Sequence, residues 1–314
     1  MGVKVFLEVV EARTKLASIL PFVVGTLFAA VYFGQVNWVN TGIFFIAMLF
    51  FDMATTALNN LMDFQKAKDN AYRHTTNIIG RAQVSPALVA IMVVTMVAIA
   101  TVLGLVLVWR TNWLLLLIGM VCFAIGIFYT FGPLPLSRLP LGEVLSGGVM
   151  GLGIPFIAVY INVPENTLLA LQLAWPQFGL TGNFVALIAL GLTCIPAMAT
   201  IANVMLANNI SDCDEDLRNH RTTLPMYLGK KYSLWLYIGL AYVGYIGILA
   251  AVIMQLLPWP ALLIVVSLPW VMANTRRFAA KQVKHETFGT SVANLVLENG
   301  SLILGLLLAW GVKG

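Results

Sequence analysis

The sequence predicts an all-α, polytopic membrane protein. Of its 314 residues, 60% are hydrophobic and only 10% are charged, whereas a soluble domain carries about 25% charged residues. The mean hydropathy of +0.90 agrees with this prediction. Such a chain has too little polar surface for a water-soluble fold, and its composition excludes a disordered chain, a collagen and a secreted disulfide scaffold.

Nine apolar segments follow one another along the chain, and each approaches the roughly 20 residues that cross the hydrocarbon core of a bilayer. The eighth is the shortest and contains Pro269. The stretch between the fifth and sixth segments, about 163–183, has Glu165 as its only charged residue, and we expect a plain external connector there. The predicted spans are residues 16–34, 41–62, 86–109, 113–131, 143–162, 184–207, 233–256, 258–274 and 293–312.

The basic residues predict the orientation of these spans. When the N-terminus is placed in the cytoplasm, only Arg110 and Lys313 fall outside the cytoplasmic segments, which leaves 16 of the 18 Lys and Arg inside. This asymmetry follows the positive-inside rule. It therefore explains the net charge of +5 by orientation in the cell membrane, and we expect no nucleic-acid partner.

Two acidic segments resemble each other at the cytoplasmic ends of the second and sixth spans. Both begin with Asn-Asn-x-x-Asp, at residues 59–63 and 208–212, and each continues to a further aspartate, Asp69 or Asp216. A basic stretch with a histidine and then a proline follow in both cases. We interpret residues 59–86 and 208–225 as a weak internal repeat, with two half-sites facing each other, inside a single domain spanning residues 1–314.

The spacing within these segments favours a metal site. Residues four apart share a helix face, so Asn59 and Asp63 point the same way, as do Asn208, Asp212 and Asp216. Carboxylate and amide oxygens suit Mg²⁺ or Ca²⁺, and Mg²⁺ prefers a few carboxylates together with substrate phosphates. The alternative is that these residues are solvated loop charges. Two matched rows on the same side of the membrane make this alternative the poorer explanation.

Basic side chains beside the acidic segments are suited to binding phosphate. Acids for a metal and bases for phosphate, at a membrane surface, predict a diphosphate with a lipid tail as the ligand. The candidate diphosphate-binding residues are Lys68, Arg73, Arg81 and Arg221.

Asp52 lies near the middle of the second span, where a carboxylate costs roughly 2.5–3.5 kcal/mol on insertion scales. It precedes Asn59 by about two helical turns and shares its face. Two interpretations remain open: a polar wall of an acceptor pocket, or a hydrogen-bonded residue of helix packing. We place Asn60, Asn209 and Tyr129 with it as candidate residues of the pocket for an acceptor or a prenyl group.

Four motifs resemble the UbiA superfamily of intramembrane prenyltransferases, and the likeness covers most of the chain. The two acidic segments carry the resemblance to the superfamily. The other two motifs are most similar to the branch that prenylates 1,4-dihydroxy-2-naphthoate in menaquinone synthesis. The motifs are Thr14–Pro21 followed by Gly25-Thr26, Asn59–Asp69, Tyr129–Pro135 with Gly142-Glu143, and Asn208–Asp216 with Arg221–Leu224.

The resemblance implies nine helices around a central cavity and a Mg²⁺-dependent reaction. A polyprenyl group would pass from its diphosphate to the aromatic acceptor 1,4-dihydroxy-2-naphthoate, with loss of CO₂, to give demethylmenaquinone. The resemblance also implies roles for the residues. Asp63, Asp69, Asp212 and Asp216 would be catalytic and hold the metal, Asn59 and Asn208 would complete or orient its ligation, and Lys68, Arg73, Arg81 and Arg221 would bind the diphosphate.

Two other functions are compatible with the sequence. The same fold prenylates other acceptors, such as 4-hydroxybenzoate or haem. A divalent-cation transporter or channel would also carry carboxylates in membrane helices. The acidic rows stand at helix ends rather than in the middle of the membrane, which favours the enzyme.

Overall fold

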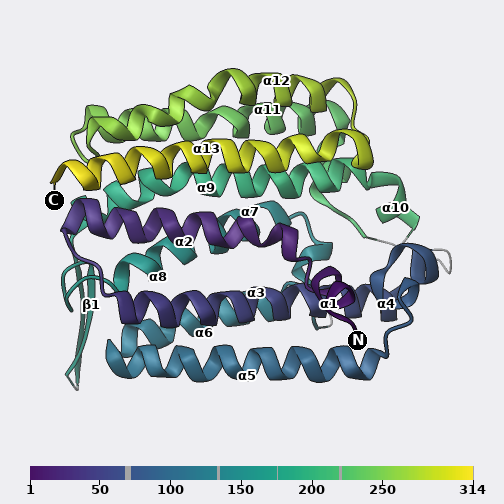
Figure 1. Cartoon of the computed structure of the whole chain (residues 1–314), viewed down its shortest axis with the longest axis horizontal. Coiled ribbons are helices and arrows are strands. Elements are labelled where there is room, and N and C mark those ends of the chain that lie inside the picture. The colour runs from purple at the N-terminus through teal and green to yellow at the C-terminus, as the bar shows by residue number, and fades with distance from the viewer. Residues whose placement is uncertain (68–71, 133–134, 175, 219–220, 314) are drawn as a thin grey trace.

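The computed structural model describes residues 1–67, 72–132, 135–174, 176–218 and 221–313. Long helices run side by side through this part of the chain (Figure 1). Seven of its helices are long and apolar enough to cross a membrane, and a shorter apolar helix covers Trp113–Phe128. The nine predicted segments lie largely on helix, which confirms the all-α, polytopic membrane fold.

The first half of the chain forms most of the lower part of the bundle in Figure 1. Its elements are α1 (Val3–Val9), the 3₁₀-helix η1 (Ala12–Lys15), α2 (Leu16–Phe28), the π-helix η2 (Ala29–Phe33), α3 (Trp38–Lys66), the π-helix η3 (Tyr72–Thr76), α4 (Ile78–Arg81), α5 (Pro86–Arg110), α6 (Trp113–Phe128), the 3₁₀-helix η4 (Leu136–Arg138), α7 (Gly142–Gly148), the π-helix η5 (Val149–Gly153) and α8 (Ile154–Tyr160).

The second half begins with a hairpin and ends with the longest helices. Its elements are β1 (Leu169–Ala174), β2 (Gln177–Gly182), α9 (Phe184–Ser211), α10 (Cys213–Arg218), α11 (Leu224–Ile253), the 3₁₀-helix η6 (Trp259–Ser267), α12 (Leu268–Ala280) and α13 (Lys284–Lys313). Helix α11 is kinked at Gly229, whose φ of 74° is left-handed, a conformation that glycine adopts without the steric cost of a Cβ.

Several predicted spans differ from a single long α-helix. The first, 16–34, continues from α2 into the π-helix η2, and the fifth, 143–162, is made of α7, η5 and α8. Helix α6 has 16 residues and is about 24 Å long. The eighth predicted span, 258–274, is divided between η6 and α12, and each of these begins with a proline in its first turn. Because proline lacks the backbone N–H, it suits the first turn of a helix and interrupts a longer one.

The connector expected at 163–183 is a β-hairpin instead. Strands β1 and β2 pair antiparallel, with Leu169 opposite Gly182 and Ala174 opposite Gln177. The backbone N–H of Asn183 then donates to Leu168 O at 3.0 Å and closes the base of the hairpin. The sequence signal for it is two six-residue runs on either side of Pro176, because a proline flanked by strand-forming residues is typical of a turn.

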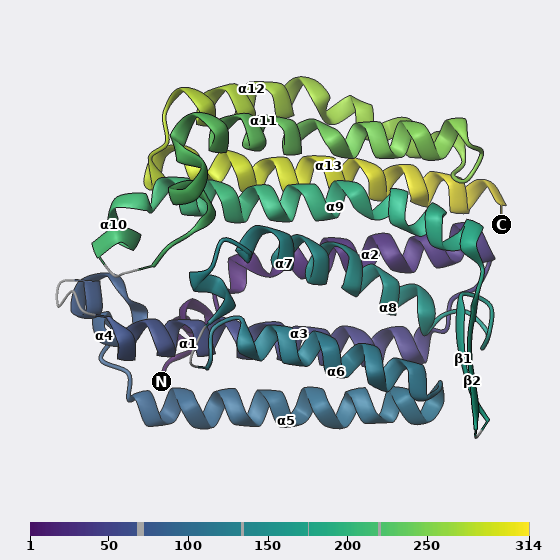
Figure 2. The ribbon, with the colours of Figure 1, turned by 180° about the vertical axis from the view of Figure 1, so that it is seen from behind.

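The bundle places the two ends of the chain on opposite sides. The N-terminus lies at the end that holds α4 and α10, whereas the C-terminus lies at the hairpin end (Figures 1 and 2). Helix α9 packs against α7, α11 and α13, and α3 packs against α5. Since α3 and α9 both end beside α4 and α10, the two acidic segments lie at the same end of the molecule.

Candidate functional site

The two Asn-Asn-x-x-Asp segments are built on different local structures. Asn59 and Asp63 both belong to α3, so the first row lies on one regular helix. Asn208 belongs to the last turn of α9, Asp212 is its C-cap, and Asp216 follows on α10. Backbone bonds from Asp212 N to Asn208 O (3.0 Å) and from Asp216 N to Asp212 O (2.8 Å) preserve the helical spacing. The expected row is therefore present across the break between the two helices.

Arg221 contacts the second acidic segment and the 3₁₀-helix η4. Its Nη1 lies 3.6 Å from Oδ1 of Asp216, and its Nη2 donates to the carbonyl oxygen of Ser137 at 3.4 Å. Burial opposes the charged guanidinium, but the carboxylates of Asp216 and Asp63 outweigh that effect and raise the pKa of Arg221 above its ordinary value. One guanidinium is thus in the field of a carboxylate from each half of the predicted repeat.

Asp216 has the surroundings of a cation ligand. Burial raises the pKa of this carboxyl group to about 6; Arg221 opposes the rise and the neighbouring charge of Asp212 adds to it. A carboxylate destabilised by burial and by a like charge gains when a cation is added. Within the described residues, no three His, Cys, Asp or Glu side chains lie close enough together to hold a metal ion by themselves. The oxygens of the two acidic rows are nevertheless the hard donors that Mg²⁺ prefers, and this ion usually takes one or two carboxylates and completes its ligation with substrate phosphates and water.

Asp212 is paired with a lysine that sequence analysis did not assign to the site. The ammonium of Lys284, the first residue of α13, bonds to Oδ2 of the Asp212 carboxylate. The two residues are 72 positions apart. No local motif links them, so only the packing of α13 beside α9 brings them together.

Two buried guanidinium nitrogens are available to an anion. Arg73 lies over the ring of Phe64, with 4.7 Å from Cζ to the ring centroid. Within the described part of the chain, Nε of Arg73 and Nε of Arg221 are buried without a hydrogen-bond partner. Because buried donors are nearly always bonded in folded proteins, these two indicate a missing acceptor such as a phosphate oxygen.

The other two predicted diphosphate residues are placed differently. The Nη2 of Arg81 lies 2.8 Å from Oε2 of Glu8 in α1, and both side chains are well exposed. Lys68, together with the predicted metal ligand Asp69, lies outside the described residues.

The loop that follows α6 contacts the first acidic row. Thr130 is buried, and its hydroxyl donates to Oδ1 of Asn59 at 3.2 Å. The preceding residue, Tyr129, points its hydroxyl to Sδ of Met205 in α9 at 3.7 Å. A side chain at Gly142 would come within 3.2 Å of that hydroxyl, so Tyr129 lies in the narrow space between α7 and α9.

The second asparagine of each motif holds a neighbouring element. The amide nitrogen of Asn60 donates to the carbonyl oxygen of Val9 at 3.0 Å, which ties α1 to α3. The amide nitrogen of Asn209 donates to Oε1 of the buried Glu143 at 2.8 Å, which ties α7 to α9. In this structure both side-chain amides therefore serve packing.

Both carboxylate oxygens of Asp52 are bound within the protein. Oδ1 lies 2.7 Å from the ammonium of Lys15, and Oδ2 accepts from the Ser18 hydroxyl at 2.6 Å. Lys15 also donates to the Thr56 hydroxyl at 2.7 Å and is only 6% exposed. These contacts favour the helix-packing interpretation of Asp52. Its partner, Lys15, is one of the basic residues that we had counted in the cytoplasmic segments.

Fold and site together define a multi-pass membrane protein that presents carboxylates and guanidinium groups at one end of a helical bundle. Residues 18–295 match the sequence pattern of the UbiA prenyltransferase family. The chain belongs to that family and is a prenyltransferase enzyme, as the motifs predicted.

One curated relative illustrates the similarity. The chain is 29% identical over 253 residues to a 1,4-dihydroxy-2-naphthoate octaprenyltransferase of Bacillus subtilis (strain 168), and the match covers 78% of this chain and 73% of the relative.

Two solved structures share the fold. A UbiA homolog from Aeropyrum pernix K1 has a TM-score of 0.69 at 18% identity, over 93% of this chain and 98% of that one. A UbiA homolog from Archaeoglobus fulgidus, bound to GPP and Mg²⁺, has a TM-score of 0.64 at 12% identity, over 98% of this chain and 99% of that one.

Proposed function

We propose that this enzyme transfers a polyprenyl group from polyprenyl diphosphate to 1,4-dihydroxy-2-naphthoate, with Mg²⁺ and with loss of CO₂. The direct product is the 1,4-hydroquinone, demethylmenaquinol, and demethylmenaquinone is its two-electron oxidised form. The observation that carries the reaction class is the pair of buried guanidinium nitrogens, Nε of Arg221 and Nε of Arg73, which have no hydrogen-bond partner in the described part of the chain and lie beside the acidic segments. The choice of acceptor is supported by the relative from Bacillus subtilis and by the two subfamily motifs in the sequence.

The metal in this proposal is held by both acidic segments. Asp63, Asp212 and Asp216 would ligate it, and Asn59 and Asn208 would complete or orient the ligation. Asp69 joins this set on the sequence pattern alone. When bound, Mg²⁺ supplies positive charge against the diphosphate leaving group, a charge that the carboxylates hold in place.

The diphosphate would be bound by basic side chains around the metal. Arg221 and Arg73 each bring a buried Nε without a partner in the described part of the chain, and a phosphate oxygen would satisfy both. Lys68 belongs to the same proposal by charge and position. Arg81 takes part when its guanidinium leaves Glu8.

The reaction breaks the bond between C1 of the prenyl group and the diphosphate oxygen. Its electron pair leaves with pyrophosphate, and the remaining allylic cation is attacked by an electron-rich carbon of the naphthoate ring. The carboxylate of the acceptor departs as CO₂, and the electron pair of its bond to the ring returns to the ring and restores the aromatic hydroquinone. An apolar, membrane-embedded pocket would keep water from the cation, with Tyr129 at the site end of α6 as its candidate polar residue. For Asp52, whose carboxylate is bound by Lys15 and Ser18, we propose the helix-packing role. For Asn60 and Asn209 we propose the packing role described above.

The proposed topology has nine crossings around a central cavity in the cytoplasmic membrane, with the site facing the cytoplasm. The chain then acts as one domain whose two acidic segments are the related halves. The opposite placement of the two termini supports an odd number of crossings (Figure 1). The basic residues predicted to lie inside support a cytoplasmic N-terminus.

The test is a product assay with purified protein in proteoliposomes. One prenyl diphosphate is offered with 1,4-dihydroxy-2-naphthoate, 4-hydroxybenzoate and haem in separate reactions, and products are identified by mass spectrometry with and without EDTA. We expect Mg²⁺-dependent pyrophosphate release and prenylated, decarboxylated naphthoate. Turnover only with another acceptor would overturn the substrate, and divalent-cation flux without turnover would replace the enzyme by a transporter.

A further inference from the structure

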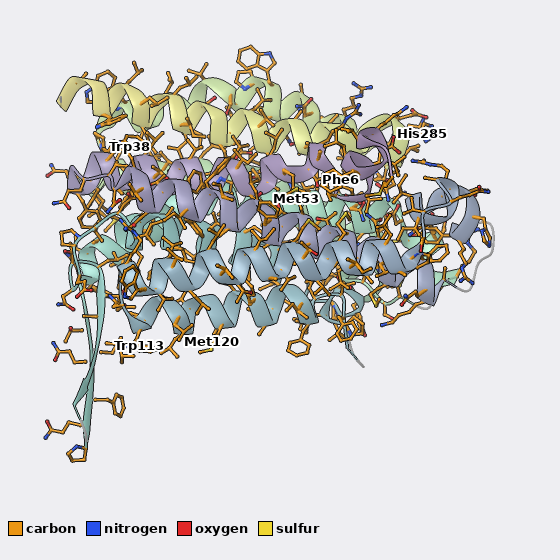
Figure 3. All side chains as sticks on the ribbon, turned by 60° about the horizontal axis from the view of Figure 1, so that its bottom comes forward. Phe6, Trp38, Met53, Trp113, Met120 and His285 are labelled. Atoms are coloured by element: carbon orange, nitrogen blue, oxygen red, sulfur yellow. The ribbon has the colours of Figure 1, made fainter. Side chains whose placement is uncertain are left out.

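The ion pair between Lys284 and Asp212 brings a solvent-facing cation onto a nearly buried anion. The Lys284 side chain is 53% exposed, whereas that of Asp212 is only 13% exposed. His285, the next residue along α13, lies at the end of the bundle opposite Trp38 and Trp113 (Figure 3). Lys284 therefore reaches the second acidic segment from the outer edge of the candidate site.

The two aspartates of this segment each have their own cation, and the two cations are held differently. Arg221 pairs with Asp216, is itself largely buried, and is fixed by a backbone bond from its N–H to Asp216 O at 2.9 Å. Lys284 makes one side-chain bond at the end of a flexible stem. An ammonium is a strongly hydrated point charge, whereas a guanidinium is a rigid fork. Lys284 can therefore leave its carboxylate at a smaller cost than Arg221 can.

We propose that Lys284 is an exchangeable cation of this site. It neutralises Asp212 while no metal is bound, gives that carboxylate to Mg²⁺, and then pairs with the diphosphate; this last step rests on the proposed function. The ammonium and a divalent cation repel each other. They therefore cannot both bind the same carboxylate oxygen at close distance. The released ammonium would stay within a side chain's length of Asp212, and therefore close to a diphosphate held beside that carboxylate.

A nearby lysine provides a matched control. Lys281, the C-cap of α12, pairs with Glu286 at 2.6 Å, and both side chains are well exposed. Lys281→Met removes the same charge three residues away without touching the acidic segments. Lys284→Arg keeps the charge at the position under test.

The first measurement is Mn²⁺ binding to the purified full-length protein by electron paramagnetic resonance, with no prenyl donor present. We expect Lys284→Met to bind Mn²⁺ about fivefold more tightly than the wild type, a factor typical of removing a half-exposed ion pair. Lys281→Met should match the wild type, and Lys284→Arg should bind no more tightly than it. Unchanged or weaker Mn²⁺ binding by Lys284→Met overturns the exchange.

The second measurement is the KM for prenyl diphosphate at saturating Mg²⁺. We expect about a tenfold rise in Lys284→Met, because a charge-assisted bond to phosphate is lost, with a smaller rise in Lys284→Arg and none in Lys281→Met. An unchanged KM overturns the transfer of Lys284 to the diphosphate. If Lys284→Met does not fold, Lys284→Gln provides both tests.

The two measurements separate this inference from the proposed function. A wild-type protein that turns over no prenyl donor would disprove prenyl transfer. The Mn²⁺ measurement needs no turnover, so it would still decide whether Lys284 competes with a metal for Asp212.

Discussion

The ammonium nitrogen of Lys15 lies 2.7 Å from a carboxylate oxygen of Asp52, and both side chains are largely buried. This pair joins the start of α2 to the middle of α3. Removing one partner of a buried pair leaves an uncompensated charge and costs about 3–5 kcal/mol.

We expect Lys15→Met to lower the melting temperature in detergent substantially, because the Asp52 carboxylate keeps only its bond from Ser18 among the side chains described. The double variant Lys15→Met, Asp52→Leu removes both charges and should recover much of that loss. Thermal unfolding of the purified proteins measures both. A double variant as unstable as the single one would show that the pairing of charges is not the source of stability.

Asp63→Asn and Asp212→Asn should each lower kcat/KM at least about 100-fold, since each removes a carboxylate that we propose as a ligand of the metal at the leaving group. The control is Asp214→Asn. Asp214 is exposed on α10, so this substitution should leave kcat/KM nearly unchanged. Steady-state assays of pyrophosphate release compare the three. Wild-type activity in both Asp63→Asn and Asp212→Asn would show that these two carboxylates are not ligands of a catalytic metal.

Arg221→Lys should raise the KM for prenyl diphosphate about tenfold, because lysine keeps the charge and loses the fork that binds two acceptors at once. Arg218→Lys, on the exposed end of α10, is the matched control and should leave KM unchanged. Competitive inhibition by pyrophosphate gives an independent measure. Equal inhibition constants for Arg221→Lys and wild type would contradict a direct contact with the diphosphate.

Gly80→Ala should weaken the binding of prenyl diphosphate, although it changes no charged side chain. A Cβ at this position would lie 1.9 Å from the carbonyl oxygen of Arg73, so the π-helix η3 that carries Arg73 has to shift. Overpacking of this kind costs about 1–3 kcal/mol. Gly104→Ala in α5 has open space around the new methyl group and serves as the control in melting and KM measurements. A Gly80→Ala protein identical to the control would mean that η3 tolerates displacement.

The apolar runs determined most of the fold from sequence alone. A helix exposed to lipid must satisfy its backbone bonds within itself, so long runs such as 184–207 become helices whatever surrounds them. The same local rule placed Asn59 with Asp63, and Asn208 with Asp212 and Asp216, at intervals of one helical turn. The charge asymmetry and the four motifs indicated the family before any contact was known.

Two parts of the chain, the eighth predicted span and the β-hairpin, differ from what hydropathy predicts. The 258–274 run is mostly apolar, yet it is divided between η6 and α12. The second of these helices begins at Leu268, with Pro269 in its first turn. The 169–182 hairpin depends on pairing across two runs, and each run alone resembles a connector. Both outcomes depend on bonds that hydropathy does not describe.

Only the tertiary structure decided which charges meet. Lys15 and Asp52 are 37 residues apart, Arg81 and Glu8 are 73 apart, and Lys284 and Asp212 are 72 apart. A charged residue in a sequence specifies no partner, because the Coulomb energy depends on distances that packing sets. The sequence alone proposed the acids of the candidate site, whereas the packing of α13 beside α9 decided that Lys284 lies next to Asp212.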